Sequence, residues 1–549
     1  MERTMGEWFE KHTIGNLVQD AANRFNSREA LVFNDERWTF KEFQEDVSRA
    51  AKALISVGIK PGEKITLWMP NCPEWLHIFF AAAQIGAILV PINTRLRTSD
   101  LQYVLQQSDS TTLITKDRSG PVNYLNMITE IYPEILQNNP RERLSESFPE
   151  LKRIIILGLE QTQGTLDYQD MISQSASISD QELLKRLDSV SPDDTALLMY
   201  TSGTTGFPKG VMHNHNILRV TTDSINRMGM TPNDIVLMYL PLFHAFGLYE
   251  GALMFIQAGS KMILTEIFDP EQALRLIEHE KITMLHGFDT HFYDLTNHPN
   301  CSTTNRSSLR TGLFASGMAS SVPVAEQAQR LLCPTITGWG MTECGVGVGM
   351  SFLDSPFEDR CAGSGYPLPG YEFKVINPET GLSVPPNNQG ELCVRGYAIM
   401  EGYYKKPQET AEAVDQNGWL HTGDVATLRE DGYLRFFGRY KDMLKVGGEN
   451  VDPIEVEAFL INHPSIKQVQ IVGVPDPRLS ETPCACVILE EGHQLNQIDI
   501  DSFCRGKLAS FKIPNNVLIL QDFPMTSSGK IQKFVLREIA QEHISSLNY

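Results

Sequence analysis

The stretch YTSGTTGFPKG, Tyr200–Gly210, decides how the fold of this chain is interpreted. It combines three glycines with four small hydroxyl side chains and a lysine, and it follows an apolar run that predicts a buried strand. Gly203 and Gly206 can adopt positive φ, so neighbouring backbone N–H groups can converge on an anion. Lys209 adds a positive charge beside these donors. The composition indicates a phosphate-binding loop, although a polar turn between two strands has the same composition.

This loop differs from the Walker A motif. Walker A requires serine or threonine directly after the lysine, whereas Gly210 follows Lys209 here. The binding groups are still of the same kind, namely backbone N–H groups, hydroxyls and one ammonium group. The hydroxyl donors of the loop are Thr201, Ser202, Thr204 and Thr205. We therefore expect a phosphate compound here, bound by a loop of another class.

Length and charge limit the class of protein. A chain of 549 residues is too long for one hydrophobic core, so we expect two or more domains. The net charge of −20, from 47 basic and 67 acidic residues, argues against a nucleic-acid partner but allows a nucleotide. The nine cysteines are scattered and odd in number. We expect them to be reduced buried thiols in a cytosolic enzyme rather than disulfides or zinc ligands.

Neither end of the chain nor its apolar segments predict a membrane protein. Residues 1–13, MERTMGEWFEKHT, mix charges and lack the apolar core of a signal peptide. The most apolar stretch, IFFAAAQIGAILVPI at 78–92, is shorter than the roughly 18 to 20 residues of a membrane span. It predicts a buried helix that runs into a strand. We expect a cytoplasmic protein without a transmembrane segment, and peripheral contact with a membrane face stays open.

The first 120 residues predict strands and helices in alternation. TFKE at Thr39–Glu42 is a capping box, in which threonine and glutamate satisfy the first backbone N–H groups of a helix. Apolar residues then recur at helical spacing until Gly58. A strand at 64–69, a helix at 73–84 and a strand at 87–92 follow. Such alternation predicts a mainly parallel sheet covered by helices.

The rest of the chain divides into three parts. A polar stretch at 161–194 predicts a surface connection, after which the alternation resumes until about Ile336. From Tyr371 to Arg439, short strands separated by Gly, Pro and Asn predict a small antiparallel sheet. Beyond Arg439, the segment IEVEAFLIN predicts a helix, and VQIVGV and CACVIL predict strands of a separate unit.

The string TSGTTG-x-PKG resembles the phosphate loop of the adenylate-forming superfamily, and further motifs of that superfamily follow in the same order. The resemblance covers residues 14–540, nearly the whole chain. It implies a large N-terminal α/β adenylation domain (1–439) with mainly parallel sheets and a small antiparallel β subdomain. A hinge (440–441) and a small mobile α+β domain (442–549) would follow. It also implies an acyl-CoA synthetase that uses ATP, Mg²⁺ and coenzyme A.

The motif GWGMTE, Gly338–Glu343, carries the second part of the resemblance. By that resemblance Trp339 packs on adenine, Thr342 contacts the α-phosphate and Glu343 holds Mg²⁺. Carboxylate and phosphate oxygens are the ligands that Mg²⁺ prefers. The backbone of an upstream turn would line adenine and the acyl group. Further nucleotide-binding positions implied here are Gly338, Gly340 and Met341, with Gly317, Met318 and Ala319 in the upstream turn.

Three motifs near the C-terminal end complete the resemblance. Asp424 in HTGD and Arg439 in GRYKD match the two ribose ligands, and a carboxylate can accept both ribose hydroxyls. Lys441 falls at the hinge and belongs to the implied cofactor-binding set, together with Gly447 and Gly448, whose loop would approach pantetheine. Lys530 matches the catalytic lysine. Its ammonium group would bridge the substrate carboxylate and the α-phosphate as charge develops.

The motifs define the carboxylic acid substrate less closely than they define the nucleotide. PLFHAFGLYEG, Pro241–Gly251, resembles a segment that lines the acyl tunnel, which would place His244 in the active site. His286 and His291 lack the spacing of a metal-binding pair. Asp289 either caps the helix that follows it or pairs with a polar substrate group.

The chain is thus identified as a member of the acyl-CoA synthetases, and the resemblance favours a medium- or long-chain fatty acid. An acyl-AMP ligase that loads a separate carrier protein, a luciferase-like monooxygenase and a non-catalytic nucleotide-binding protein are the alternatives. Lys530, Thr342, Glu343, Lys209 and His244 would be the catalytic residues. The carboxylic acid, ATP and coenzyme A would be the binding partners, and a homodimer stays open.

Overall fold

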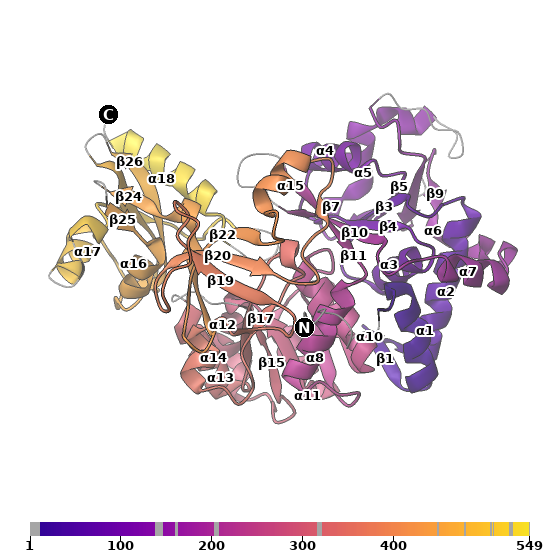
Figure 1. Ribbon diagram of the computed structural model, residues 1–549, viewed down its shortest axis with the longest axis horizontal. Coiled ribbons are helices and arrows are strands. Elements are labelled where there is room, and N and C mark those ends of the chain that lie inside the picture. The colour runs from indigo at the N-terminus through magenta and orange to yellow at the C-terminus, as the bar shows by residue number, and fades with distance from the viewer. Residues whose placement is uncertain are drawn as a thin grey trace.

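The structure is a computed structural model that describes residues 11–137, 147–159, 163–201, 208–315, 321–446, 449–476, 479–505, 508, 510–525 and 531–547. Figure 1 shows an elongated molecule in which the last hundred residues form one end and the remaining chain forms the other. The described helices include none with the combined length and apolar character that crossing a membrane requires. All nine cysteines are free and buried, as expected.

Two large sheets organise the first 440 residues. In the described part of the chain they have the orders β18-β17-β16-β15-β14-β12-β13-β1-β2 and β21-β11-β10-β4-β3-β5-β8-β9. Most neighbouring strands are parallel, which confirms the prediction, and antiparallel strands lie at the edges. The strands of the first sheet are β1 (Glu29–Phe33), β2 (Glu36–Thr39), β12 (Ile235–Met238), β13 (Lys261–Leu264), β14 (Met284–Gly287), β15 (Thr311–Phe314), β16 (Ile336–Trp339), β17 (Gly349–Met350) and β18 (Tyr366–Pro367). Those of the second are β3 (Lys64–Trp68), β4 (Ile88–Pro91), β5 (Thr112–Lys116), β8 (Arg153–Leu157), β9 (Leu166–Asp167), β10 (Thr195–Thr201), β11 (Lys209–Asn214) and β21 (Gly402–Tyr403).

Helices α2 and α3 join the two sheets. Helix α2 packs on β1 and β2, α3 packs on β4, and the two helices pack on each other. The predicted capping box starts α2, with Thr39 Oγ1 accepting from Glu42 N–H and Glu42 accepting from Thr39 N–H. Almost every side chain of α3 is buried, which explains why this segment is apolar on all sides. The helices of the first 240 residues are α1 (Ile14–Phe25), α2 (Phe40–Ser56), α3 (Pro73–Gln84), α4 (Thr98–Ser108), α5 (Tyr124–Ile131), α6 (Tyr168–Ser173), α7 (Asp180–Asp188) and α8 (Ile217–Met228).

One expectation about this region was wrong. The polar stretch at 161–194 was predicted to be a surface connection, but it contains β9, α6 and α7. Tyr168, Met171 and Leu183 bury their side chains, and α6 and α7 pack on α2. A few widely spaced apolar residues are enough to dock a short helix when the opposite face is solvated. The polar composition therefore hid the helices.

The remaining elements before residue 440 include two smaller sheets. The sheet β19-β20-β22-β23 is antiparallel throughout, as predicted for residues 371–439. Its strands are β19 (Glu372–Ile376), β20 (Gly390–Arg395), β22 (Leu420–Leu428) and β23 (Leu434–Arg439), and a two-stranded ribbon has β6 (Arg118–Ser119) and β7 (Val122–Asn123). The other helices before residue 440 are α9 (Ala245–Gly247), the π-helix η3 (Leu248–Leu253), α10 (Met254–Ala258), α11 (Pro270–Glu280), α12 (Asp289–Asn297), α13 (Val322–Leu331), α14 (Phe357–Ala362) and α15 (Pro407–Ala413).

The C-terminal part has its own sheet and core. The predicted strands lie in β26 and β27, which pair antiparallel over their whole length, and the predicted helix is α16. Its buried apolar residues form two clusters of their own, beginning at Leu444. The elements are the 3-10 turn η7 (Tyr440–Asp442), β24 (Leu444–Val446), β25 (Glu449–Val451), α16 (Pro453–Leu460), β26 (Ile466–Asp476), β27 (Ser480–Leu489), α17 (Gln497–Cys504), β28 (Asn516–Ile519) and α18 (Lys533–Leu547).

Candidate active site

The strands that flank the opening motif are described, although its centre is not. Strands β10 and β11 pair antiparallel, and Thr201 stands opposite Lys209 as the last pair before the loop. Ser202, Gly203, Thr204, Thr205 and Gly206 lie outside the described residues, so their contacts stay predictions. The apolar run that precedes the loop is buried in β10, as predicted.

Lys209 begins β11 and points toward the neighbouring edge strand. Its Nζ lies 4.8 Å from the centre of the Tyr403 ring, a distance typical of a cation–π contact. Tyr403 comes from β21, which pairs with β11. The lysine ammonium is therefore held beside the loop by an aromatic face.

Asp424, Trp339 and Arg439 form one buried polar contact. Trp339 Nε1–H donates to Asp424 Oδ2 at 3.0 Å, and Arg439 Nε lies 3.0 Å from Asp424 Oδ1. Asp424 is 3% exposed and stands opposite Arg439 in the β22–β23 register. A buried carboxylate held at both oxygens has a fixed orientation and a paired charge. The two predicted ribose ligands are thus adjacent in space.

Trp339 contributes to this site mainly through its indole N–H. The residue is 6% exposed, and its ring packs edge-on against Phe373. The contacts that the structure shows are therefore with Asp424 and Phe373. Packing of Trp339 against adenine stays a prediction.

Glu343 lies beside Lys209 through a shared neighbour. Tyr403 Oη–H donates to Glu343 Oε1 at 3.0 Å, so one tyrosine contacts both predicted phosphate-site residues. Glu343 is 8% exposed, and the hydroxyl bond orients its carboxylate. A nearly buried carboxylate next to an ammonium group and a phosphate loop fits the oxygen ligands that Mg²⁺ takes. The residues present are therefore compatible with a magnesium ligand at Glu343.

The backbone around Thr342 is fixed by a buried histidine. His213 Nε2–H donates to the Thr342 carbonyl at 2.6 Å, because a carbonyl can only accept. Burial lowers the pKa of His213 to about 4, so the ring is neutral at physiological pH. Gly340 approaches the chain closely, since a Cβ there would lie 2.3 Å from the Gly347 nitrogen. Gly338 lies in β16, and Met341 directly precedes Thr342.

His244 and Glu250 belong to the segment predicted to line the acyl tunnel. His244 precedes α9, and its Nδ1 accepts from Phe246 N–H at 3.3 Å. Glu250 lies on the π-helix η3, is 1% exposed, and neither carboxylate oxygen has a hydrogen-bond partner among the described residues. Burial raises the pKa of Glu250 to about 8, while the nearby Ser224 hydroxyl acts in the opposite direction. The carboxyl packs against Gly347, where a Cβ would lie 2.2 Å from Oε1.

Asp289 stands at the start of α12, but not in the predicted position. The N-cap residue is Phe288, and Asp289 is the first helical residue, so its placement as the cap was wrong. Its carboxylate nevertheless accepts from Thr290 N–H at 2.9 Å and from Ser321 Oγ–H at 2.8 Å. Asp289 thus ties the first turn of α12 to the start of α13. His286 is buried and His291 is half-buried, and desolvation lowers the pKa of each to about 4.

Asp289→Ala should cost about 1 kcal/mol of stability, the usual cost of losing a side-chain acceptor at a helix start. Asp289→Ser should recover part of that loss and keep the acid preference unchanged, because its hydroxyl can also accept from the first turn. Chemical denaturation and an acid panel on both variants measure this. A shift of acid preference that is equal in both variants would assign Asp289 to the substrate instead.

Several predicted residues lie outside the described part of the chain. These are Gly317, Met318, Ala319, Gly447, Gly448 and Lys530. For Lys530 the flanks are described, because Met525 and Ile531 form an isolated antiparallel bridge across residues 526–530. For Lys441 the backbone is described in η7 between β23 and β24.

Sequence reasoning missed three residues that the structure brings to the site. Tyr403 and His213 lie in none of the motifs named above, and Glu250 lies in the predicted acyl-tunnel segment without having been singled out. Each contacts residues far away in the chain. The sequence signal for Glu250 was a glutamate among the apolar residues of Leu248–Leu253, because burying an unpaired carboxylate costs free energy. The sequence offers no comparable signal for Tyr403 or His213.

Two family models match the chain. One, described as "AMP-binding enzyme", matches residues 18–404, and the other, "AMP-binding enzyme C-terminal domain", matches residues 455–530. The Bacillus subtilis (strain 168) protein named putative acyl-CoA synthetase YngI is 38% identical over 530 residues, which cover 96% of each chain. The human protein named medium-chain acyl-CoA ligase ACSF2, mitochondrial, is 34% identical over 97% of this chain and 88% of its own.

Solved structures share the fold over nearly the whole length. The anthranilate CoA ligase AuaEII in complex with anthranoyl-AMP has a TM-score of 0.85 at 26% identity, covering 97% of this chain and 98% of that one. ATP-bound MatB from Rhodopseudomonas palustris has a TM-score of 0.83 at 25% identity, covering 96% of this chain and 99% of that one.

Proposed function

Because the chain belongs to the AMP-binding enzyme family and is an acid–thiol ligase, we propose that it activates a medium- or long-chain fatty acid. In this proposal ATP and the acid form acyl-AMP with release of pyrophosphate, and coenzyme A then takes the acyl group. The observation that carries the nucleotide half is the contact of Trp339 and Arg439 with Asp424. The name of the human relative, medium-chain acyl-CoA ligase, supports the choice of acid.

The roles of the site residues follow from their chemistry. Asp424 and Arg439 bind the ribose, and the loop with Thr201 and Lys209 binds phosphate oxygens. Glu343, oriented by Tyr403, would hold Mg²⁺, which neutralises phosphate charge when it is bound.

No covalent nucleophile on the enzyme is needed, because the acid's own carboxylate attacks the α-phosphorus in line. Thr342 contacts the α-phosphate from a backbone fixed by His213. His244 faces the acid. Catalysis is therefore mainly positioning and charge stabilisation.

In this proposal the C-terminal part takes two positions in turn, a first pose for adenylation and a second pose for thioester formation. Its core is separate from that of the first 440 residues, and η7 at Tyr440–Asp442 is the connection between them. A hinge at 440–441 would let Lys530 serve adenylation and the loop with Gly447 and Gly448 serve thioester formation. A cytoplasmic location and a homodimer remain part of the proposal, and size-exclusion chromatography with light scattering tests the dimer.

The test is pyrophosphate release across a panel of carboxylic acids, with and without coenzyme A, followed by mass spectrometry of the products. We expect thioester formation with free coenzyme A and the highest kcat/KM with fatty acids. Acyl-AMP that transfers only to an added carrier protein would support an acyl-AMP ligase instead. Light emission with a luciferin and oxygen would support a luciferase-like monooxygenase.

Asp424→Asn should raise the KM for ATP by about tenfold, the value of one or two weakened hydrogen bonds to a charged group. The amide group keeps one acceptor oxygen, and its NH₂ group cannot accept from Trp339 or Arg439, so the ribose ligand loses its fixed orientation. Initial rates at varied ATP measure the effect. Asp431→Asn, in the exposed turn after β22, is the matched control and should leave the KM unchanged. An unchanged KM in Asp424→Asn would remove Asp424 from the ribose site.

A further inference from the structure

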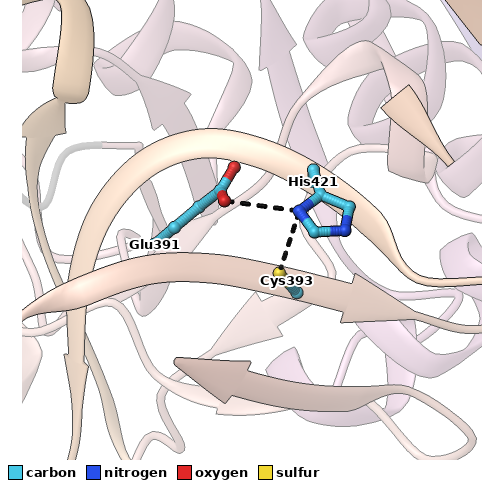
Figure 2. Close-up of side chains that lie close together, drawn as sticks. All are labelled: Glu391, Cys393 and His421. Carbon is cyan, nitrogen blue, oxygen red and sulfur yellow. Dashed lines mark hydrogen bonds and ion pairs between the residues drawn. The ribbon is translucent and has the colours of Figure 1, made fainter. Parts of the chain in front are cut away.

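Glu391, Cys393 and His421 form a compact cluster on β20 and β22 (Figure 2). Their ligand atoms all lie within 4.8 Å of one another. His421 Nδ1 is 3.3 Å from Glu391 Oε2 and 3.6 Å from Cys393 Sγ. Tetrahedral zinc, with bonds of about 2.0 Å to N or O and about 2.3 Å to S, places neighbouring ligand atoms roughly 3.3 to 3.6 Å apart. The two distances from His421 Nδ1 match that geometry.

The two strands hold these side chains on one face. Cys393 stands opposite His421 in the antiparallel register, and Glu391 is two residues away on the same face of β20. The register shifts between Glu391 and Cys393, which leaves a bulge in β22 around Gly423 (φ +68°). Gly423 N–H donates to Glu391 Oε1 at 3.1 Å. The backbone therefore fixes Glu391 with its other oxygen toward His421.

The second ring nitrogen of His421 faces another carboxylate. His421 Nε2 lies 4.0 Å from Asp415 Oδ2, while Asp415 Oδ1 accepts from Asn417 N–H and Trp419 N–H. Metal-binding histidines usually direct their other N–H to a carboxylate in this way. With that proton on Nε2, the Nδ1 lone pair would face a carboxylate oxygen and a thiol. A cation between the three atoms would be bound by this lone pair, the carboxylate oxygen and the sulfur together.

The surroundings favour a soft divalent ion. Cys393 is buried, so a thiolate there needs a neighbouring cation to compensate its charge. Lys374, opposite Cys393 on β19, lies over the Trp419 ring at 4.1 Å from its centre. The side chains of His421 and Glu391 are 32% and 14% exposed, so an ion and a water can enter. Thiolate, imidazole and carboxylate together suit zinc better than magnesium.

We propose that Glu391, Cys393 and His421 form a zinc site, separate from the magnesium ligand Glu343 and adjacent in sequence to Asp424. Zinc replaces the thiol proton, and any proton on His421 Nδ1, and these protons pass to solvent. The cysteines were not expected to be metal ligands, because they are scattered along the sequence. Cys393 and His421 are 28 positions apart. Only the β20–β22 register brings them together.

The test uses cobalt(II) as a spectroscopic probe of the full-length, chelator-treated protein, with excess Mg²⁺ present. We expect one cobalt per chain, with a thiolate-to-cobalt charge-transfer band and the visible absorption of four-coordinate cobalt. Zinc should displace the cobalt and raise the melting temperature by mass action. Cys393→Ser should lose the charge-transfer band, and zinc should bind that variant more weakly by a factor on the order of ten or more.

Glu391→Gln is the conservative variant, because its amide oxygen can still accept from Gly423 N–H. It should fold like the wild-type protein but bind zinc more weakly and gain no thermal stability from it. Cys361→Ser, at a buried cysteine outside the cluster, is the matched control and should bind cobalt normally. A protein that binds no cobalt holds only a histidine–carboxylate ion pair here. Either that result or a charge-transfer band that survives in Cys393→Ser overturns the proposal.

Discussion

Lys530→Ala should lower the rate of pyrophosphate release by a factor on the order of 10² or more, the scale of losing one charge-stabilising group. The ammonium group is needed where the carboxylate meets the α-phosphate, so adenylation should lose its stabilisation. Thioester formation from supplied acyl-AMP and coenzyme A should continue near the normal rate, because this step no longer involves that charge. Single-turnover assays of the two half-reactions measure the difference.

Lys441→Pro should show the opposite pattern. Proline fixes φ near −65° and removes a donor, so it should hinder rotation at η7 without touching the contacts of Asp424 or Glu343. Pyrophosphate release should be nearly normal, and thioester formation should be slow. Lys512→Ala is the control, because it removes a C-terminal lysine that only pairs with Glu455 at the surface. Equal loss in both half-reactions for Lys530→Ala, or in neither for Lys441→Pro, would contradict the two-pose mechanism.

Glu250 should make the stability of the protein fall as the pH rises. In the unfolded chain this carboxyl releases its proton near its ordinary pKa of 4.5, whereas burial holds its pKa at about 8 in the folded protein. The folded state therefore binds more protons in this window. The contribution of this carboxyl to the unfolding free energy is fully present below about pH 4.5. It is lost progressively up to about pH 8, and the loss is on the order of 5 kcal/mol.

Glu250→Gln isolates this effect, because the amide fills the same space and does not titrate. The difference in unfolding free energy between the variant and the wild-type protein should grow in favour of the variant from about pH 5 to about pH 8. Denaturant midpoints by intrinsic fluorescence at several pH values measure it. Glu326→Gln, on the surface of α13, should follow the wild-type curve. Parallel curves for Glu250→Gln would mean that Glu250 is not held neutral.

The buried Glu250 lies on the π-helix η3, which gives its protonation state a second consequence. A π-helix is rare and is found mostly where function requires it. Here it carries an acid with no partner in the described residues against Gly347, a few residues after Glu343. A neutral carboxyl in this position can donate a hydrogen bond, which an ionised one cannot. The cost of ionising the buried Glu250 therefore lowers the stability of the protein at neutral pH. This residue belongs to the segment predicted to line the acyl tunnel.

The sequence by itself determined the elements whose signals are local. The capping box at Thr39, the all-apolar helix α3 and the short antiparallel strands after Tyr371 follow from propensity, spacing and turn residues. The motif order also identified the family, because these motifs are continuous strings whose chemistry needs neighbouring residues. Local signals failed at 161–194, where short polar helices depend on docking to α2.

Only the tertiary structure decided which residues meet. Trp339 and Asp424 are 85 positions apart, Tyr403 and Glu343 are 60 apart, and their hydrogen bonds exist because elements distant in the chain converge. The sequence likewise left the burial of Glu250 undetermined, because this burial depends on the packing of η3 against a loop about a hundred residues later. Spacing in sequence fixes contacts only within an element. Contacts between elements depend on sheet order and register, and these are properties of the whole packed core.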